Sequence, residues 1–162
     1  MLKRLSHGFG PLYGHDSEIL ILGSFPSKKS REEGFFYGHP QNRFWAVVST
    51  ALMAKEPKTI EEKRSFVIDH HLALYDVIES CLIEGSSDDS IREVRPANLS
   101  SIVKAAPIKR ILLNGQTAAK YFRLFQKIDS SIEVFVLPST SSANASFTLE
   151  GLVEAWKKAI AG

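Results

Sequence analysis

Four short runs of apolar residues, each interrupted by Gly, Asp or Pro, constrain the fold of this chain more than any other feature. The runs occupy 18–23, 71–78, 109–115 and 132–138. A short, continuous apolar run is typical of a strand that is buried on both faces, as in a parallel sheet. Because Gly, Asp and Pro interrupt regular structure, each strand is expected to end at such a residue.

Helical patterns alternate with these runs. Apolar residues recur at helical spacing within 44–52, 99–105, 117–125 and 149–160. Thr59 and Glu62 have the spacing of a capping box and predict the start of a further helix. Strands that alternate with helices need crossover connections. The pattern therefore predicts an α/β fold, a three-layer α/β/α sandwich around a central, mainly parallel sheet of about four strands.

Composition fits one globular domain spanning residues 1–162. Hydrophobic residues make up 44% of the chain and charged residues 23%, which is ordinary globular usage. The one cysteine, Cys81, excludes an internal disulfide and a four-thiolate zinc or iron-sulfur centre. We therefore expect no metal or organic cofactor. No apolar run approaches the ~18 residues of a membrane span, and no secretion signal is visible.

The net charge of +2 conceals an uneven distribution. Residues 1–60 carry +3, residues 61–100 carry −5 and residues 101–162 carry +4. A protein that binds nucleic acid needs positive charge only where phosphates pass. The modest total therefore neither excludes nor establishes such a partner.

The strand ends are where a ligand is expected, because open parallel sheets bind ligands beyond the carboxyl ends of their strands. Four segments meet this condition: 23–42, the neighbourhood of Asp76, 114–116 and 138–147. The first and last are the richest in Gly, Pro, Ser, His and Asn. The chain has no Gly-x-Ser-x-Gly sequence, the motif of α/β serine hydrolases.

Two of these segments carry a family resemblance. Residues 23–27 read Gly-Ser-Phe-Pro-Ser, and residues 37–45 read Tyr-Gly-His-Pro-Gln-Asn-Arg-Phe-Trp. Together they resemble the first motif of the uracil-DNA glycosylase superfamily. Residues 137–144, Leu-Pro-Ser-Thr-Ser-Ser-Ala-Asn, resemble its second motif, the loop that enters the duplex. The sequences of both motifs are most similar to those of the hypoxanthine-DNA (deoxyinosine) glycosylase family, and the resemblance spans roughly residues 7–160.

The resemblance implies a monofunctional DNA glycosylase of base excision repair. Such an enzyme hydrolyses the N-glycosidic bond of a deaminated base flipped out of double- or single-stranded DNA, here hypoxanthine first and uracil second. It also implies a cytoplasmic monomer, associated with the nucleoid through DNA, and no membrane contact. The competing interpretation is a catalytically weak or inactive nucleic-acid or nucleotide-binding module with the same fold.

Asn42 is the predicted catalytic residue. The mismatch-specific members of the superfamily carry a catalytic Asn at the position of Phe25. The hypoxanthine family is similar to this chain in having no Asn in that turn, and the resemblance implies that the functional Asn is the one in His-Pro-x-Asn, which is Asn42 here. Its carbonyl can orient a water and its amide can hydrogen-bond the departing base, as positioning and fixed dipoles require. Asn is also a favoured helix cap, and the two roles are compatible.

The remaining site predictions form two groups, each with a structural alternative. The predicted substrate-binding residues are Gly23, Ser24, Phe25, Tyr37 and His39. The predicted DNA-binding residues are Ser139, Thr140, Ser141, Asn144 and Lys28. Tyr37 can stack on the base or lie in the core, and His39 can contact a purine nitrogen or only shape its turn. The Ser-rich loop can bind phosphate or merely connect two elements, and Lys28 can contact phosphate or remain solvated.

Overall fold

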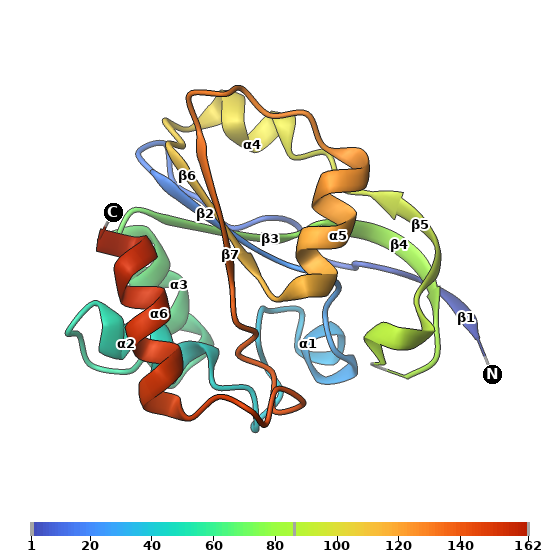
Figure 1. Ribbon diagram of the computed structural model, residues 1–162, viewed down its shortest axis with the longest axis horizontal. Helices are drawn as coiled ribbons and strands as arrows, with labels where there is room; N and C mark the ends of the chain where they lie inside the picture. The colour runs from blue at the N-terminus through green and yellow to red at the C-terminus, as the bar shows by residue number, and fades with distance from the viewer. Residues whose placement is uncertain (1, 86, 162) are drawn as a thin grey trace.

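The four predicted strands form one parallel sheet. The computed structural model describes residues 2–85 and 87–161. The strands are β2 (Ile19–Gly23), β3 (Leu72–Asp76), β6 (Arg110–Asn114) and β7 (Glu133–Leu137), and their order across the sheet is β3-β2-β6-β7 (Figure 1). All three neighbouring pairs are parallel. The α/β prediction is confirmed.

Burial of this sheet on both faces explains the continuous apolar runs. Leu20 and Leu22 of β2 pack into one hydrophobic cluster, whereas Ile19 and Ile21 pack into another on the opposite face. Leu20, Ile21 and Leu22 have no exposed surface. Since successive side chains of a strand point to opposite faces, a strand that is covered on both sides needs apolar residues at every position.

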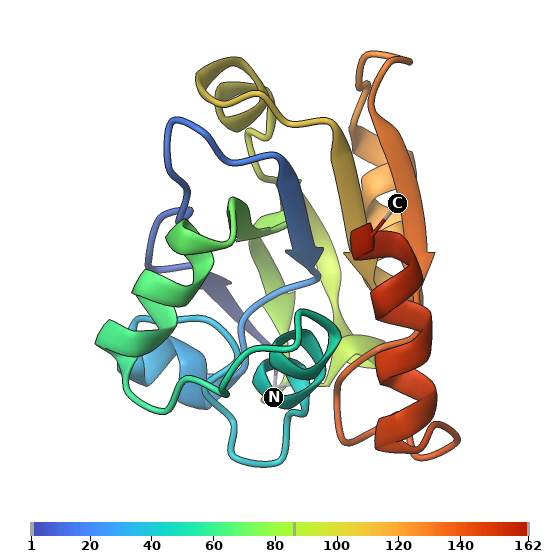
Figure 2. The ribbon, with the colours of Figure 1, turned by 90° about the vertical axis from the view of Figure 1, so that its left-hand side faces the viewer.

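Helices cover the two faces of the sheet. The helices α2 (Phe44–Ala51), α3 (Ile60–Asp69) and α6 (Leu149–Ala161) contribute to one cluster, and α4 (Ser100–Ala105) and α5 (Gln116–Phe125) contribute to the other. Figure 2 shows α6 running beside β7. The predicted capping box is present, because Thr59 accepts from the Glu62 amide and Glu62 accepts from the Thr59 amide. No helix of the described residues is long and apolar enough to cross a membrane.

A second, smaller sheet was not predicted. Its strands, β1 (Lys3–Ser6), β4 (Ile78–Ile83) and β5 (Arg92–Pro96), are antiparallel in the order β1-β4-β5. The apolar run 71–78 contains all of β3 and the first residue of β4, which are separated by Val77. The sequence pattern merged them because both are buried. Two short elements, α1 (Lys28–Glu33) and the 3-10 helix η1 (Asp88–Ser90), were also missed.

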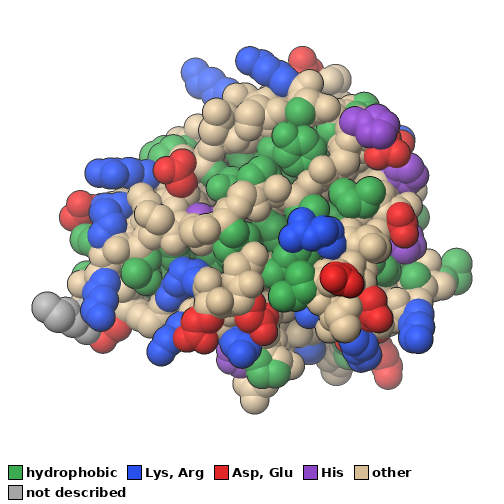
Figure 3. All heavy atoms as spheres, turned by 180° about the vertical axis from the view of Figure 1, so that it is seen from behind, with side chains coloured by type: hydrophobic (Ala, Val, Ile, Leu, Met, Phe, Trp, Pro, Cys, Tyr) green, Lys and Arg blue, Asp and Glu red, His purple; other side chains and the backbone are tan. Residues whose placement is uncertain are grey.

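The carboxyl ends of the four parallel strands lie at one end of the molecule. There they meet α1, η1 and the segment between β7 and α6, which occupy the lower part of Figure 1. In the view from behind (Figure 3), Lys and Arg side chains are interspersed with Asp and Glu, so neither sign of charge gathers into one continuous patch on that face.

Candidate active site

A cavity of about 450 Å³ opens at the carboxyl ends of the strands. Most of the predicted site residues line it: Gly23, Ser24, Phe25, Tyr37, His39, Asn42, Ser139, Thr140 and Ser141. Asn144 instead lines a neighbouring groove, on the other side of the Ser139–Ser141 segment. Lys28 is the exposed first residue of α1. The structure thus brings the two motifs together around one cavity.

Asn42 is held by its carbonyl oxygen. Oδ1 accepts a hydrogen bond from the backbone N–H of Phe44 at 2.9 Å and from the hydroxyl of Thr140 at 2.8 Å. A backbone amide can only donate, so the bond to Phe44 fixes which end of the side-chain amide is oxygen. Among the described residues, none accepts a hydrogen bond from Nδ2. The N-cap residue of α2 is Arg43, so Asn42 caps the first amide of the helix from one residue further out. Its NH₂ group is left available to the cavity that it lines.

Thr140 joins the two motifs through Asn42 and Asn114. Its hydroxyl donates to Asn42 and accepts from Nδ2 of Asn114 at 3.0 Å, and its backbone N–H donates to Oδ1 of Asn114 at 3.0 Å. Thr140 has no exposed surface. Its side chain is thus a structural link between loops, and the predicted contact of this residue with phosphate stays a prediction.

Arg43 anchors the second motif loop by its backbone and its side chain. Its N–H donates to the carbonyl of Thr140 at 3.0 Å. The guanidinium donates to the carbonyls of Phe147 at 2.7 Å, Asn144 at 3.0 Å and Ser141 at 3.3 Å. A planar guanidinium suits several carbonyls at once. This arginine of the first motif therefore fixes the shape of the loop that the resemblance places in the duplex.

Tyr37 is held in a constrained backbone conformation. Its φ angle is 52°, a left-handed value that is uncommon for a bulky residue and that clusters at functional sites. Its ring stacks on Phe44 with centroids 3.9 Å apart, and its hydroxyl accepts from Asn114 at 3.3 Å. Burial, and next the negative charge of Asp76, raise the pKa of Tyr37, which keeps the phenol neutral. One ring face is occupied by Phe44, and stacking of a base on the other stays a prediction.

The other predicted substrate residues lie around the same cavity. His39 accepts from the Gln41 backbone amide through Nδ1 at 3.1 Å, so its neutral ring carries the proton on Nε2. Ser24 donates to the carboxylate of Asp88 at 3.2 Å. Phe25 is nearly buried, with the Arg31 guanidinium over its ring at 5.6 Å. Each of these side chains has a local structural partner, and their contacts with substrate stay predictions.

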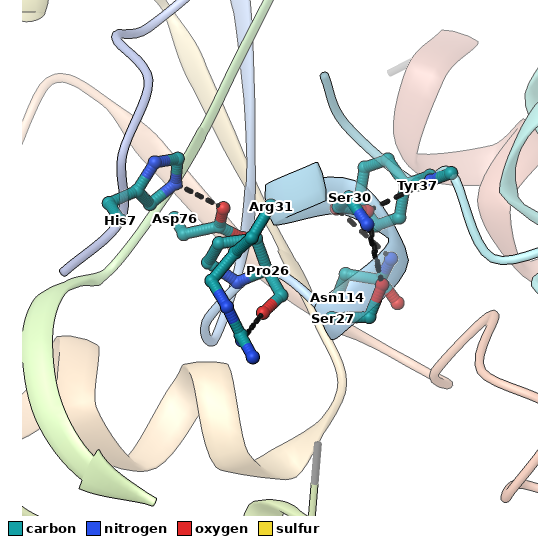
Figure 4. A network of polar contacts seen from close by, with 9 residues as sticks. His7, Pro26, Ser27, Ser30, Arg31, Tyr37, Asp76 and Asn114 are labelled. Atoms are coloured by element: carbon teal, nitrogen blue, oxygen red, sulfur yellow. Dashed lines mark hydrogen bonds and ion pairs between the residues drawn. The ribbon is translucent and has the colours of Figure 1, made fainter. Parts of the chain in front are cut away.

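Two functional candidates were missed by the sequence analysis as site residues. Asp76 ends β3, lines the cavity and is only 4% exposed, and His7 lies beside it with 2% exposure. His7 Nε2 is 2.6 Å from Asp76 Oδ2 (Figure 4). The position of Asp76 at a strand end was a visible signal. His7 carried none, because it reaches this place only through the pairing of β1 with the unpredicted β4.

The charged residues that line the cavity are acidic. Asp76 lies inside, and Asp88 and Asp89 of η1 also contribute to the wall, whereas the described lining residues include no Lys or Arg. Within the described residues, no cluster of three or more His, Cys, Asp or Glu could hold a metal ion. The cavity thus combines aromatic rings, amide groups and carboxylates, a lining suited to a flat polar ring and to positive charge developing beside it.

Fold and cavity together define an α/β/α protein with a cavity of aromatic, amide and carboxylate side chains at the carboxyl edge of its parallel sheet. The family model of the Uracil DNA glycosylase superfamily matches residues 11–160. The chain belongs to this superfamily and is a DNA glycosylase, a hydrolase whose substrate is DNA.

Individual relatives agree with this assignment. A protein of Methanosarcina acetivorans named hypoxanthine DNA glycosylase is 34% identical over 150 residues, which cover 91% of this chain and 92% of the relative. A protein of the same name from Methanosarcina barkeri is 29% identical over 140 residues, 85% of this chain and 87% of the relative. A solution NMR structure of a Methanosarcina acetivorans protein assigned to the uracil DNA glycosylases has a TM-score of 0.81, with 32% identity and coverage of 99% and 97%.

Gly23 is expected to tolerate no side chain. A Cβ atom at this position would lie 2.5 Å from Asp76 Oδ1 and 3.1 Å from the Tyr37 hydroxyl. We expect Gly23→Ala to displace both groups, to lower the free energy of unfolding by about 1–3 kcal/mol and to reduce glycosylase activity. Chemical denaturation and an activity assay measure the two effects. Gly10→Ala is the control, because no heavy atom lies within 4 Å of its added Cβ, and equal behaviour of the two variants would contradict the prediction.

Arg43→Met is expected to loosen the second motif loop. The substitution keeps the apolar stem and removes all three side-chain hydrogen bonds to the loop carbonyls. A bond to a charged group is worth about 2 kcal/mol, so loss of even one of the three should make loop amides exchange hydrogen at least about 30-fold faster. Hydrogen–deuterium exchange over 139–147 measures this. Lys158→Met removes the same charge from an exposed site on α6 and should leave the loop unchanged; unchanged exchange in Arg43→Met would contradict the anchoring role.

Proposed function

We propose that this enzyme is a monofunctional DNA glycosylase of base excision repair that releases hypoxanthine, and secondarily uracil, after the base is flipped out of DNA. The names of the two Methanosarcina relatives support the choice of hypoxanthine. The observation that carries the proposal is the free amide of Asn42 at a cavity lined by aromatic rings and carboxylates. A flipped base needs such a cavity beyond the duplex.

Cleavage of a glycosidic bond creates charge of both signs. The sugar becomes oxocarbenium-like and positive, and the departing base becomes negative. The carboxylates of Asp76, Asp88 and Asp89 give the cavity a negative potential, which favours the sugar cation. The Asn42 NH₂ group supplies a fixed donor for the base. Because its carbonyl oxygen is locked by two hydrogen bonds, this donor needs little reorganisation during the reaction.

The same geometry supports a role for Asn42 at the base rather than at the water. The sequence left both roles open. In the folded chain Oδ1 already accepts from the Phe44 amide and the Thr140 hydroxyl, so its two lone pairs are occupied. Orienting a water would need that oxygen, whereas hydrogen bonding to the departing base needs only Nδ2. We therefore place Asn42 as the donor to the leaving base.

Water is the proposed nucleophile. A combined glycosylase and lyase would need an amine beside the sugar, and no lysine is among the described residues that line the cavity. Contacts with DNA phosphates are assigned to the hydroxyls and amides of Ser139 and Ser141, to Asn144 at the neighbouring groove, and to Lys28 on the exposed start of α1. We propose that the enzyme acts as a monomer in the cytoplasm, on the DNA of the nucleoid.

The proposed activity is tested on duplexes that contain one deoxyinosine or deoxyuridine. Alkali cleaves the abasic product, so strand scission reports base release. Scission at deoxyinosine that exceeds scission at deoxyuridine is expected. Binding of DNA without any scission would favour the competing function, a nucleic-acid-binding module that keeps the fold without turnover.

Asn42→Asp is expected to keep the oxygen that caps α2 and to remove the NH₂ group that is the proposed catalytic donor. Asp keeps an oxygen for the Phe44 amide and the Thr140 hydroxyl, and it is as good a cap as Asn, so the free energy of unfolding should change by less than about 0.5 kcal/mol. Loss of one preorganised donor should slow hypoxanthine release about 10²–10³-fold. Urea unfolding and single-turnover scission measure the two quantities.

Two further outcomes make this test decisive. Asn42→Ala removes the cap and the donor together, so it should lower both stability, by about 1 kcal/mol, and activity. If Asn42→Asp instead retained the wild-type rate, the reaction would depend on an acceptor at this position, and Asn42 would act on the water.

Lys28→Gln is expected to lower the salt dependence of DNA binding. Each phosphate contact contributes about −0.9 to the slope of log K against log salt concentration, so loss of one contact should reduce the slope by about 1. Fluorescence anisotropy with a duplex that carries a stable abasic analogue measures this slope. Lys158→Gln on α6 is the matched control. A slope equal to that of wild type would show that Lys28 makes no phosphate contact.

A further inference from the structure

The hydrogen bond between His7 and Asp76 has no role in the mechanism described so far, in which Asp76 contributes only its negative charge. His7 follows β1 and Asp76 ends β3, and the two side chains meet with Nε2 and Oδ2 2.6 Å apart (Figure 4). They are 2% and 4% exposed. A buried carboxylate is costly unless it is hydrogen-bonded. Its presence on the wall of the cavity therefore calls for a function.

The surroundings of His7 fix its proton. Aromatic rings enclose it: Phe9, Tyr75, Phe36 and Phe25, with centroids between 4.4 and 6.3 Å away. Nδ1 is buried and has no hydrogen-bond partner among the described residues. A buried N–H without an acceptor costs about 1–3 kcal/mol, so the proton belongs on Nε2. His7 therefore donates to Asp76 Oδ2 and acts only on that oxygen.

The second oxygen of Asp76 lies beside Gly23 of β2. Oδ1 lies 2.5 Å from the point where a side chain would begin at Gly23, and the Tyr37 hydroxyl lies 3.1 Å from the same point. Gly23, Tyr37 and Asp76 all line the cavity. The Tyr37 oxygen accepts from Asn114, so its own hydrogen is free to donate. The absence of a side chain at Gly23 thus leaves an acceptor and a donor close together.

We propose that Asp76 reads the flipped base by accepting the ring N–H of a deaminated base through Oδ1, with Tyr37 donating to the adjacent carbonyl oxygen and His7 acting as the positioning residue. The assignment rests on the proposed function. Hypoxanthine and uracil both carry an N–H next to a C=O on the edge away from the sugar. Adenine and cytosine, from which they arise, present a bare ring nitrogen beside an amino group. Against those parent bases the carboxylate meets a lone pair and the hydroxyl meets an N–H donor.

Depth in the cavity favours base reading over activation of water. Asp76 is 4% exposed, whereas Asn42 is half-buried and His39 is exposed at the same cavity. The sugar stays attached to the DNA backbone, so its reacting carbon remains near the mouth. The far edge of a purine, with its N–H and C=O, enters deepest. A nearly buried carboxylate is therefore placed to meet the edge of the base.

The test compares two bases that differ only at this edge. One duplex carries hypoxanthine, and the other carries unsubstituted purine, which lacks the N1 hydrogen and the C6 oxygen. Both are placed on a 2′-fluoroarabino sugar, which resists hydrolysis, so dissociation constants can be measured by anisotropy. Wild type is expected to bind the hypoxanthine duplex about 10-fold or more tightly than the purine duplex, since one good hydrogen-bonded contact is worth at least 1.4 kcal/mol.

Asp76→Asn is expected to abolish or invert this preference. The variant has the same shape, and the N–H of His7 will hold its carbonyl oxygen, so the cavity receives an NH₂ donor in place of an acceptor. Binding of the hypoxanthine duplex should weaken, whereas binding of the purine duplex should not. The effect of Asp76→Asn on binding free energy is compared between the two duplexes, and the difference isolates the contact between residue 76 and the edge of the base. Equal weakening for both duplexes, or an equal affinity of wild type for both, would overturn the assignment of Asp76.

His7 is tested by a pair of variants. His7→Phe keeps an aromatic ring among its neighbours and removes the donor, and His7→Gln keeps an N–H donor. The preference for hypoxanthine should be lost in the first and largely kept in the second. A purely structural role for His7 would lower both affinities and leave their ratio unchanged. Unfolding midpoints of all variants are measured in parallel.

Different results would contradict the proposed function and the assignment of Asp76. Release of hypoxanthine from an ordinary deoxyinosine duplex is measured for wild type alongside the binding data. Absence of release would contradict the proposed function, and the assignment would fall with it. Normal release together with equal binding of the two analogues would contradict the role of Asp76 alone.

Discussion

The hydrogen bond between the Thr140 hydroxyl and the Asn42 carbonyl is the contact on which the site depends. It joins two loops that are 98 residues apart in sequence, at 2.8 Å. Because Thr140 is fully buried, an unmade bond there would leave a polar group without water or partner, which is costly. Asn114 closes the network from a third strand end by pairing with both the amide and the hydroxyl of Thr140. The loops are thus specified by satisfaction of their polar groups as much as by apolar packing, and the cavity exists because they hold this arrangement.

This network also explains how a neutral side chain can serve catalysis. Asn is a weak base and a weak acid, so its contribution must come from a fixed dipole. Its orientation is determined by two groups of the protein itself, namely the first amide of α2 and the Thr140 hydroxyl. The structural role of Asn42, which uses its oxygen, and its proposed catalytic role, which uses its nitrogen, therefore depend on the two ends of one amide. A cap that uses the oxygen orients the nitrogen.

The sequence predicted the parts of the molecule whose neighbours are close along the chain or whose burial is complete. The doubly buried strand Ile19–Gly23 and the Thr59 capping box are of this kind, because periodicity and local hydrogen bonds determine them. The exposed strand Arg92–Pro96 was missed because it carries no apolar alternation and is held by its pairing with β4. His7 was missed for a related reason: its significance arises from proximity to Asp76, 69 residues away. Arg43 stood within a recognised motif, but nothing local indicated that it holds carbonyls about 100 residues further along the chain.

The fold places charged residues of the acidic and basic segments of the chain differently relative to the cavity. Phosphate contact requires positive charge outside the cavity, whereas a sugar cation forming at its mouth requires negative charge within and around it. The acidic middle of the chain supplies Asp76, Asp88 and Asp89 to the wall of the cavity, and the first basic flank supplies Lys28 on the surface of α1. A strongly basic cavity would hold DNA more tightly and oppose the charge that forms on the sugar. The same negative wall opposes the charge that forms on the departing base. The proposed donors to that base are accordingly neutral groups, the amide of Asn42 and the phenol of Tyr37, whose pKa is raised by burial.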